Sequence, residues 1–283
     1  MNTKLVTTLT AVTALLLTTQ VPARASGFNF VSNVTKANGA VGDITLNSIA
    51  QGGKTTEAKD LSYVKAVDII YNTKIDPSKG SSATPGASNN NTGAASTDKG
   101  DKATSPLLNG SLLNPSGVTD PTAAAIAAYL GNNNLNNIID TEDSGKFTLN
   151  VWFTKAVASI LLWERGMNSR ISVQAINSTG QVIGNLLKLD SSTWQYAGYD
   201  IDTTEIGGAQ KVGSIGISLA DLGLKDAIAG IQLSTDGSKG DNGPDFKVAG
   251  EAASVPEPLT MGGLALGVSG MIAARRRRTH KTA

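Results

Sequence analysis

The sequence predicts a mainly β protein: a single antiparallel β-sandwich or jelly-roll-like domain with one short helix and one long polar loop. Three observations support this prediction. Short segments alternate apolar and polar residues with the two-residue period of a half-buried strand. Clusters of Gly, Asn and Asp separate these segments, as the turns of an antiparallel sheet require. No long amphipathic helix alternates with the strands, which argues against a doubly wound α/β fold.

The first third of the chain contains three strand-like segments and then changes in composition. Alternation runs through residues 28–30 and 44–46, and residues 67–71 form a third apolar run. Residues 74–104 consist mostly of Ser, Thr, Gly, Asn and Ala. Such a segment buries too little apolar surface to offset the entropy lost on ordering, so we expect a long flexible polar loop there.

A short helix is expected over residues 123–130. Asp120 is the predicted N-cap and Pro121 the first helical residue, because the N–H that Pro lacks would have no partner within the helix. Gly131 is predicted to end the helix.

From residue 146 onwards the pattern is again that of strands. Phe147, Leu149 and Val151 share one face of the first segment, with Thr148, Asn150 and Trp152 on the opposite face. The predicted strands are residues 146–153, 171–176, 181–184, 212–219, 230–234 and 245–249.

Residues 1–25 have the parts of a secretory signal peptide, which we expect to form a signal helix before the domain. Lys4 supplies the positive start, and residues 5–17 supply the apolar core. Ala23 and Ala25 form an A-x-A cleavage site. The alternative is a buried helix or a membrane anchor, but the apolar run is shorter than the ~20 residues that usually span a bilayer.

The mature chain is expected to start at Ser26 and to fold as one domain over residues 26–250. The sequence contains no cysteine, so no disulfide can stabilise it. Seven of the 24 Lys and Arg lie in the predicted signal and the C-terminal tail, whereas all 23 Asp and Glu lie between them. The intervening chain therefore carries 17 basic against 23 acidic residues, a net charge of −6, which argues against nucleic acid as a partner.

The C-terminal segment has three features in a fixed order. A Pro-Glu-Pro triplet comes first, formed by Pro256, Glu257 and Pro258. Residues 259–274 follow without a charge, and at 1.5 Å per residue they would form a transmembrane helix of roughly 24 Å, short of a ~30 Å hydrocarbon core. A cluster of arginines that should remain in the cytoplasm closes the segment: Arg275, Arg276, Arg277 and Arg278.

This segment resembles the PEP-CTERM sorting signal, placed at residues 251–283 with a basic tail at 275–283. The resemblance implies recognition by an exosortase, a membrane cysteine protease, with cleavage near the Pro-Glu-Pro triplet. It also implies a bacterium that makes an extracellular polysaccharide matrix. The protein would pass through an inner-membrane intermediate and end secreted, in the envelope, on the cell surface or in the matrix. The alternative is a plain C-terminal membrane anchor.

The domain itself resembles a family of exosortase-dependent surface proteins associated with cyanobacteria, which implies no particular activity. In that family the residue after Asn168-Ser169 is usually acidic, whereas here it is Arg170. The residues that carry the resemblance are 27–30, 133–143, 163–169, 220–223 and 243–248.

The residue inventory argues against an enzyme. The only histidine, His280, lies in the predicted tail and there is no cysteine, so Ser-His-Asp catalysis and His-based zinc or copper sites are excluded from the mature chain. No phosphate-binding or dinucleotide-binding fingerprint is present. A glycoside hydrolase would need two facing carboxylates about 5–10 Å apart, for which Glu142 and Glu164, each with an aspartate, are the candidates.

Three oxygen-rich clusters could bind calcium, which takes 6–8 oxygen ligands from flexible loops. They lie at residues 98–101, 140–143 and 241–245. The best candidates are Asp140, Glu142 and Asp143, because three acids within four residues repel one another unless a cation or a spread-out geometry relieves them. The alternative is that these residues only form turns and caps.

The segment around Trp163 is the candidate glycan-binding site. Trp163 could stack on a sugar ring while Glu164, Arg165 and Asn168 bind its hydroxyls. The alternative, which we favour, is that Trp163 belongs to the core and Glu164 pairs with Arg165 at the end of a strand. Trp152 and Trp194 could likewise be exposed platforms or core residues.

Taken together, the sequence favours a non-enzymatic surface or matrix protein, with calcium as a stabilising ion. A carbohydrate-binding module for exopolysaccharide is the second hypothesis, and a glycoside hydrolase is the third.

Overall fold

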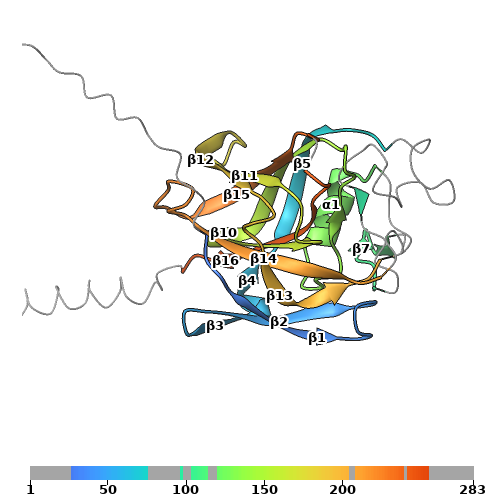
Figure 1. Ribbon diagram of the computed structural model, residues 1–283. Helices are drawn as coiled ribbons and strands as arrows, with labels where there is room; N and C mark the ends of the chain where they lie inside the picture. Colours follow the sequence, from blue (N-terminus) through green and yellow to red (C-terminus); the bar gives the residue numbers. More distant parts are fainter. Residues whose placement is uncertain are drawn as a thin grey trace, which may run out of the picture.

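The computed structural model describes residues 27–75, 96–97, 103–113, 120–203, 208–238 and 241–254 (Figure 1). The predicted signal peptide, the Pro-Glu-Pro tail with its apolar span, and most of the predicted polar loop lie outside these residues. Within the described ranges, no helix is both long enough and apolar enough to cross a membrane.

The described chain is mainly β and its strands pair antiparallel, which confirms the predicted class. One large branched sheet, a three-stranded sheet (β1–β2–β3) and a small hairpin (β7–β8) make up the fold. The strands are β1 (Val31–Lys36), β2 (Ile44–Gln51), β3 (Lys54–Glu57), β4 (Leu61–Ser62), β5 (Val64–Asn72), β6 (Ser96–Thr97), β7 (Leu107–Leu108), β8 (Ser111–Leu112), β9 (Ile139–Asp140), β10 (Phe147–Arg165), β11 (Ile171–Ile176), β12 (Val182–Leu189), β13 (Gln195–Ile201), β14 (Gln210–Ser218), β15 (Ile228–Thr235) and β16 (Asp245–Ala252). The helical elements are the 3₁₀ turn η1 (Ala58–Asp60) and the helix α1 (Ala123–Leu130).

The long strand β10 organises the large sheet. Its first half, over residues 147–153, pairs with β15 on one edge and β5 on the other. Its second half, over residues 157–165, pairs with β16 and β14, and only Val157 in this half also pairs with β15. The exposed residues 154–156 separate the two halves. One strand therefore contributes to two layers, which gives the molecule a sandwich-like arrangement (Figure 1).

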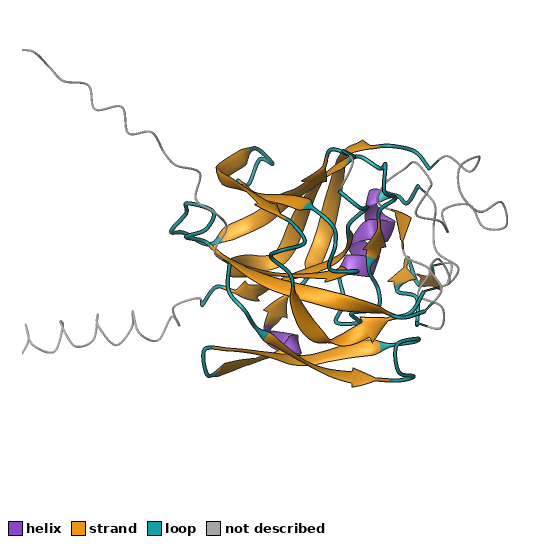
Figure 2. Cartoon of the chain, viewed as in Figure 1, coloured by secondary structure: helices purple, strands orange, loops and turns teal. Residues whose placement is uncertain are grey.

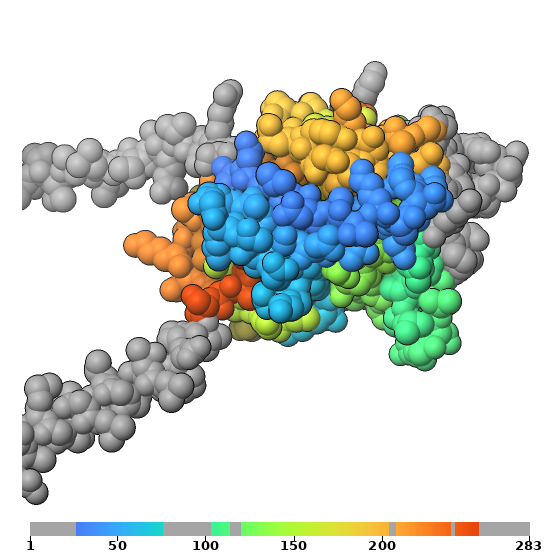
Figure 3. Space-filling view, turned by 90° about the horizontal axis from the view of Figure 1, so that it is seen from below, coloured from blue at the N-terminus to red at the C-terminus, as the bar shows by residue number. Residues whose placement is uncertain are grey.

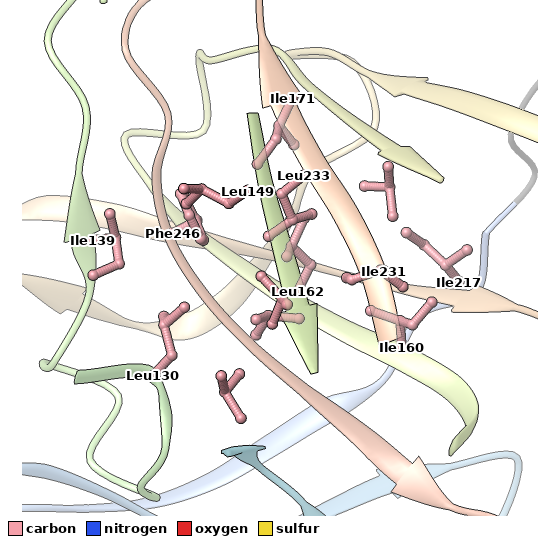
Figure 4. Close-up of a cluster of buried hydrophobic side chains, with 14 of the residues drawn as sticks. Leu130, Ile139, Leu149, Ile160, Leu162, Ile171, Ile217, Ile231, Leu233 and Phe246 are labelled. Atoms are coloured by element: carbon pink, nitrogen blue, oxygen red, sulfur yellow. The ribbon is translucent and has the colours of Figure 1, made fainter. Parts of the chain in front are cut away.

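The main hydrophobic core lies between these two layers (Figure 4). Strands β10, β11, β14, β15 and β16 all contribute to it. Each fully buried Leu, Ile or Phe stabilises the fold by roughly 1.5–3 kcal/mol relative to an exposed position. Figure 4 labels Leu149, Ile160, Leu162, Ile231, Leu233 and Phe246, all of which are fully buried.

The second half of β10 is buried on both faces. Ile160 and Leu162 face the main core, whereas Leu161 and Trp163 face a second core covered by the three-stranded sheet. A strand covered on both sides is apolar at consecutive positions and does not alternate. The predicted end of this strand at Phe153 was wrong for that reason. Figure 3 shows the blue N-terminal residues spread over this side of the molecule.

Helix α1 occupies the predicted residues and packs against β5 (Figure 2). The predicted N-cap, Asp120, and the predicted first helical residue, Pro121, were both wrong, because Thr122 caps the helix by accepting the N–H of Ala125 at 3.2 Å and the helix begins at Ala123. The Asp120 carboxylate accepts the N–H of Ile75 at 3.0 Å instead. Gly131 follows the last helical residue as predicted, and a Cβ there would lie 2.7 Å from the carbonyl oxygen of Val64.

The asparagine-rich segment after α1 ties the helix to the three-stranded sheet. Asn134 Oδ1 accepts the N–H of Ile44 at 3.1 Å, and its Nδ2 donates to Asp43 at 2.7 Å. The N–H of Leu135 donates to the carbonyl of Ile44 at 2.7 Å. The side chain of Asn136, which is buried, donates to the carbonyl of residue 42 at 2.6 Å. These asparagines therefore satisfy backbone groups at the edge of β2.

Candidate functional site

Trp163, the residue considered for stacking on a sugar, is only 1% exposed. Its ring meets Phe30 edge to face, with 5.3 Å between centroids and an angle of 86°. The indole Nε1 donates to Ser32 Oγ at 2.9 Å, so its one polar group is satisfied inside the protein. The glycan-binding interpretation of Trp163 is therefore wrong, and the alternative that it belongs to the core is confirmed. Trp194 is a core residue too.

Arg165 lies in the second core beside the first residue of β16. Its Nη2 lies 2.6 Å from Asp245 Oδ2 and its Nε donates to the same oxygen at 3.0 Å. Nη1 donates to the hydroxyl of Thr203, and all three residues are buried. The expected pair between Arg165 and Glu164 is replaced by this pair with Asp245, because consecutive residues of a strand point to opposite faces.

Glu164 is fully buried on the face opposite to Arg165. Its Oε1 accepts the hydroxyl of Ser169 at 2.5 Å, and its carboxylate also accepts the backbone N–H of Met167. Burial raises the pKa of Glu164 to about 8, and the charge of Asp245 adds to this while the Ser169 hydrogen bond opposes it. Asn168, the fourth predicted glycan-binding residue, is exposed.

Of the predicted calcium ligands, Asp140 is the last residue of β9, and Glu142 and Asp143 lie in the turn between β9 and β10. Asp140 and Glu142 are buried, whereas Asp143 is exposed. Thr141 between them donates its N–H to Asp245 Oδ1 at 3.1 Å, so this turn lies against the start of β16. Desolvation first, and then the charge of Asp245, raises the pKa of Asp143. Among the residues that the structure describes, no three or more His, Cys, Asp and Glu side chains are grouped to hold a metal ion. Calcium binding here stays a prediction.

Lys247 is a buried charged residue that the sequence did not single out. It is fully buried on β16, and its Nζ donates to the carbonyl of Tyr129 in the last turn of α1 and to Asn132 Oδ1 at 3.2 Å. Burial lowers the pKa of Lys247 well below its ordinary value of 10.5. The contact places the amino group at the negative end of a helix, which favours its charged form and so opposes the effect of burial.

Trp152 is the tryptophan that reaches the surface, and it lies on a polar sheet face. It is partly exposed, and its Nε1 donates to Asp68 Oδ2 at 2.7 Å, which fixes the ring. The ring covers Gly230 on the neighbouring strand, where a Cβ would lie 3.1 Å from Cε3. Beside it Gln232 donates to Asn150 Oδ1 at 3.0 Å. The sequence signal was the position of Trp152 in alternation with Thr and Asn.

A polar cleft of about 540 Å³ lies at the end of this face, where β10, β11, β12 and β15 meet. Three hydroxyl side chains in one row of the sheet form part of its wall: Thr148, Ser172 and Ser234. Charged side chains of both signs surround it: Lys146, Arg170, Lys188, Asp190, Asp236 and Asp241. Such a surface can exchange hydrogen bonds with a hydroxyl-rich ligand.

A second groove, of about 870 Å³, lies between α1, the asparagine-rich segment and the β7–β8 hairpin. The leucines of this hairpin, Leu107 and Leu112, are each 64% exposed. Glu142 and Glu164, the carboxylates considered for glycoside hydrolysis, line neither this groove nor the polar cleft. The described geometry therefore offers no support for a hydrolase built on these two glutamates.

No protein-family model matches the sequence, and the search of curated proteins found no match.

Proposed function

We propose that this chain is an exported, non-enzymatic surface or extracellular-matrix protein that an exosortase processes at residues 256–258. The observation that carries the proposal is the ordered triplet, apolar span and arginine cluster at the C-terminus, combined with a signal peptide at the N-terminus. In this proposal the mature part is one β-sandwich domain. The signal helix and the transmembrane span at 259–274 are transient and are removed during export.

The extent of the folded domain supports this proposal. At the N-terminal side, Phe28 exchanges two backbone hydrogen bonds of 2.8 Å with Gly216. At the C-terminal side, the N–H of Ala253 donates to the carbonyl of Ala156 at 2.9 Å, so the paired backbone extends slightly beyond the predicted boundary at residue 250. The two proposed cleavage sites, after Ala25 and near the Pro-Glu-Pro triplet, both fall outside this paired region. Cleavage at either site would leave both cores intact.

The test is to express the full chain in an exosortase-containing bacterium and to compare it with a Glu257→Ala variant. Glu57→Ala, a change of an exposed glutamate on β3, is the matched control. We expect the control to be processed normally and the Glu257→Ala variant to accumulate at higher mass in the membrane fraction. Deletion of the exosortase should give the same accumulation. Normal processing in the deletion strain would refute the proposal.

A second candidate function is binding of the producer's own exopolysaccharide, favoured by the polar face around Trp152. An aromatic ring can cover the C–H face of a sugar while amides and hydroxyls bind its polar groups. Here Trp152 and Gln232, both partly exposed, lie in adjacent rows of the sheet, next to the row of hydroxyls that lines the polar cleft. The buried Asn150 accepts from Gln232 and donates to the carbonyl of Gly180, so it orients Gln232 and does not itself face a ligand. This site replaces the one considered at Trp163.

A glycan array probed with the full chain tests this function. We expect Trp152→Ala to lower any polysaccharide signal at least tenfold. Tyr196→Ala, which removes a 50% exposed aromatic ring on β13, should leave the signal unchanged. Equal loss in both variants would place the binding elsewhere, and no signal on any polysaccharide would count against the function itself.

A further inference from the structure

Two turns meet beside Glu164 and bring several oxygen atoms together around one hydroxyl group. Ser169 Oγ lies 2.5 Å from Glu164 Oε1, 2.9 Å from the backbone carbonyl oxygen of Asn242 and 3.4 Å from Asn168 Oδ1. A serine hydroxyl carries one hydrogen and can donate to only one of these three oxygens. The cluster therefore holds more acceptors than its hydroxyl can satisfy.

The carboxylate of Glu164 makes this excess larger. Its Oε2 atom is buried and has no hydrogen-bond partner among the described residues. The adjacent cation, Arg165, makes its ion pair with Asp245 on the other face of β10. A buried carboxylate that has no ion-pair partner of its own is strongly unfavourable, and proteins offset this by a proton, a paired cation or a bound metal ion.

The ligand set is suited to a hard cation. Calcium takes 6–8 oxygens from carboxylates, amides, carbonyls and water. The cluster supplies carboxylate, amide, hydroxyl and backbone carbonyl oxygens. Asn168 and Asn242 are exposed, so an ion and its remaining waters can reach the cluster from solvent.

We propose that Glu164, Asn168, Ser169 and the carbonyl of Asn242 form a calcium site between the β10–β11 turn and the turn before β16. It is distinct from the predicted ligands Asp140, Glu142 and Asp143. Since a single carboxylate contributes charge, the affinity belongs with weak extracellular sites, with a Kd on the order of 10⁻⁴–10⁻³ M. Occupancy at such an affinity requires an extracellular location, and in that respect alone the inference rests on the proposed export.

Thermal unfolding of the full chain, purified with chelator, tests the site directly. With a Kd of about 1 mM, calcium at about 10 mM should shift the folding equilibrium roughly tenfold and raise the midpoint by about 3–6 °C. Magnesium at the same concentration should give a much smaller shift, because it prefers a tighter octahedral shell.

Variants separate the proposed site from the other possibilities. Glu164→Gln and Asn168→Ala should each abolish most of the calcium shift, whereas Asp143→Asn should retain it. The Asn168→Ala change lies at an exposed position, so it tests a ligand without disturbing the core. Loss of the shift in Asp143→Asn alone would place the ion in the turn before β10 and overturn the proposal.

The competing explanation is that Glu164 is simply protonated. In that case the wild type would show no calcium shift, and Glu164→Gln, which mimics the neutral acid, would be as stable as the wild type. That result would also overturn the proposal. Because purified protein is used, neither outcome depends on whether the sorting signal is processed.

Discussion

Replacing Asp245 with alanine is expected to destabilise the domain by at least about 3–5 kcal/mol. The side chain of Arg165 is 1% exposed and that of Asp245 is 10% exposed, so the ion pair between them is a buried one. Removing one partner of a buried pair leaves the other charge uncompensated, which typically costs about 3–5 kcal/mol. The change also removes the acceptor of the Thr141 N–H, at a further cost of about 1–3 kcal/mol.

The chain provides its own control, an exposed ion pair in the same domain. Lys54 Nζ lies 3.9 Å from Glu251 Oε1, and the side chain of Lys54 is 77% exposed. Exposed pairs contribute about 0–1 kcal/mol, so Lys54→Ala should have little effect. Urea unfolding with linear extrapolation measures both changes, provided that the slope of the free energy against urea stays the same.

A loss below about 1 kcal/mol for Asp245→Ala would refute this reasoning, because it would mean that the guanidinium finds an equivalent environment without its carboxylate. The double variant Arg165→Met with Asp245→Leu should recover most of the loss, since apolar side chains of similar size often replace a buried pair at little cost. A double variant as unstable as the single one would show that packing, and not charge, dominates.

Two further predictions concern buried groups. Burial lowers the pKa of Lys247 in the folded state well below 10.5. Between that lowered pKa and the pKa of an unfolded lysine, about 10.4, the unfolded state binds a proton that the folded state does not. The free energy of unfolding should therefore rise with pH across this window. Lys247→Met should flatten the rise, measured as the difference in unfolding free energy between pH 7 and pH 9.5, and an unchanged difference would contradict the assignment. Gly216→Ala should cost about 1–3 kcal/mol, because its Cβ would lie 2.1 Å from the ring of Phe28. Adding Phe28→Leu should reduce that cost, and strict additivity of the two changes in urea unfolding would show that the residues do not interact.

The pattern of apolar, polar and capping residues along the sequence predicted those elements whose burial and ends depend on residues close to them in sequence. Strand β11 has the predicted bounds, because apolar and polar side chains alternate from Ile171 to Ala175 and only the last residue, the buried Ile176, departs from the pattern. Helix α1 covers the expected residues 123–130, because an alanine-rich segment is bounded by a capping residue and a glycine. The N-cap was predicted at the wrong residue, because Asp120 and Thr122 are both good N-caps and the sequence alone does not distinguish them. The hydrogen bond from Ile75, a residue distant in sequence, decided between them.

The candidate site could not be predicted in the same way, because it depends on what covers each face. The segment at Trp163 contained an aromatic and two charged residues, a composition that suits a sugar site. The three-stranded sheet covers this part of β10, and burial turns the same residues into core and ion pair. Trp152 was placed on the polar face by alternation, yet nothing in the sequence showed that its ring stays partly exposed there while the neighbouring Asn150 is buried. Sequence can assign a residue to a face of a strand, but the layer above that face comes from distant parts of the chain.

Because the end of β10 is buried on both faces, the buried ion pair between Arg165 and Asp245 has a structural role in setting the register of β16. Arg165 pairs in register with Asp245, and Glu164 pairs in register with Phe246. Both faces of this part of β10 are covered, so burial alone would penalise a slip of one residue only weakly. Such a slip would move Asp245 to the opposite face from Arg165 and leave two buried charges apart. The ion pair therefore fixes the register of β16, and the same register brings the turn that contains Asn242 against Ser169, where the proposed calcium site lies.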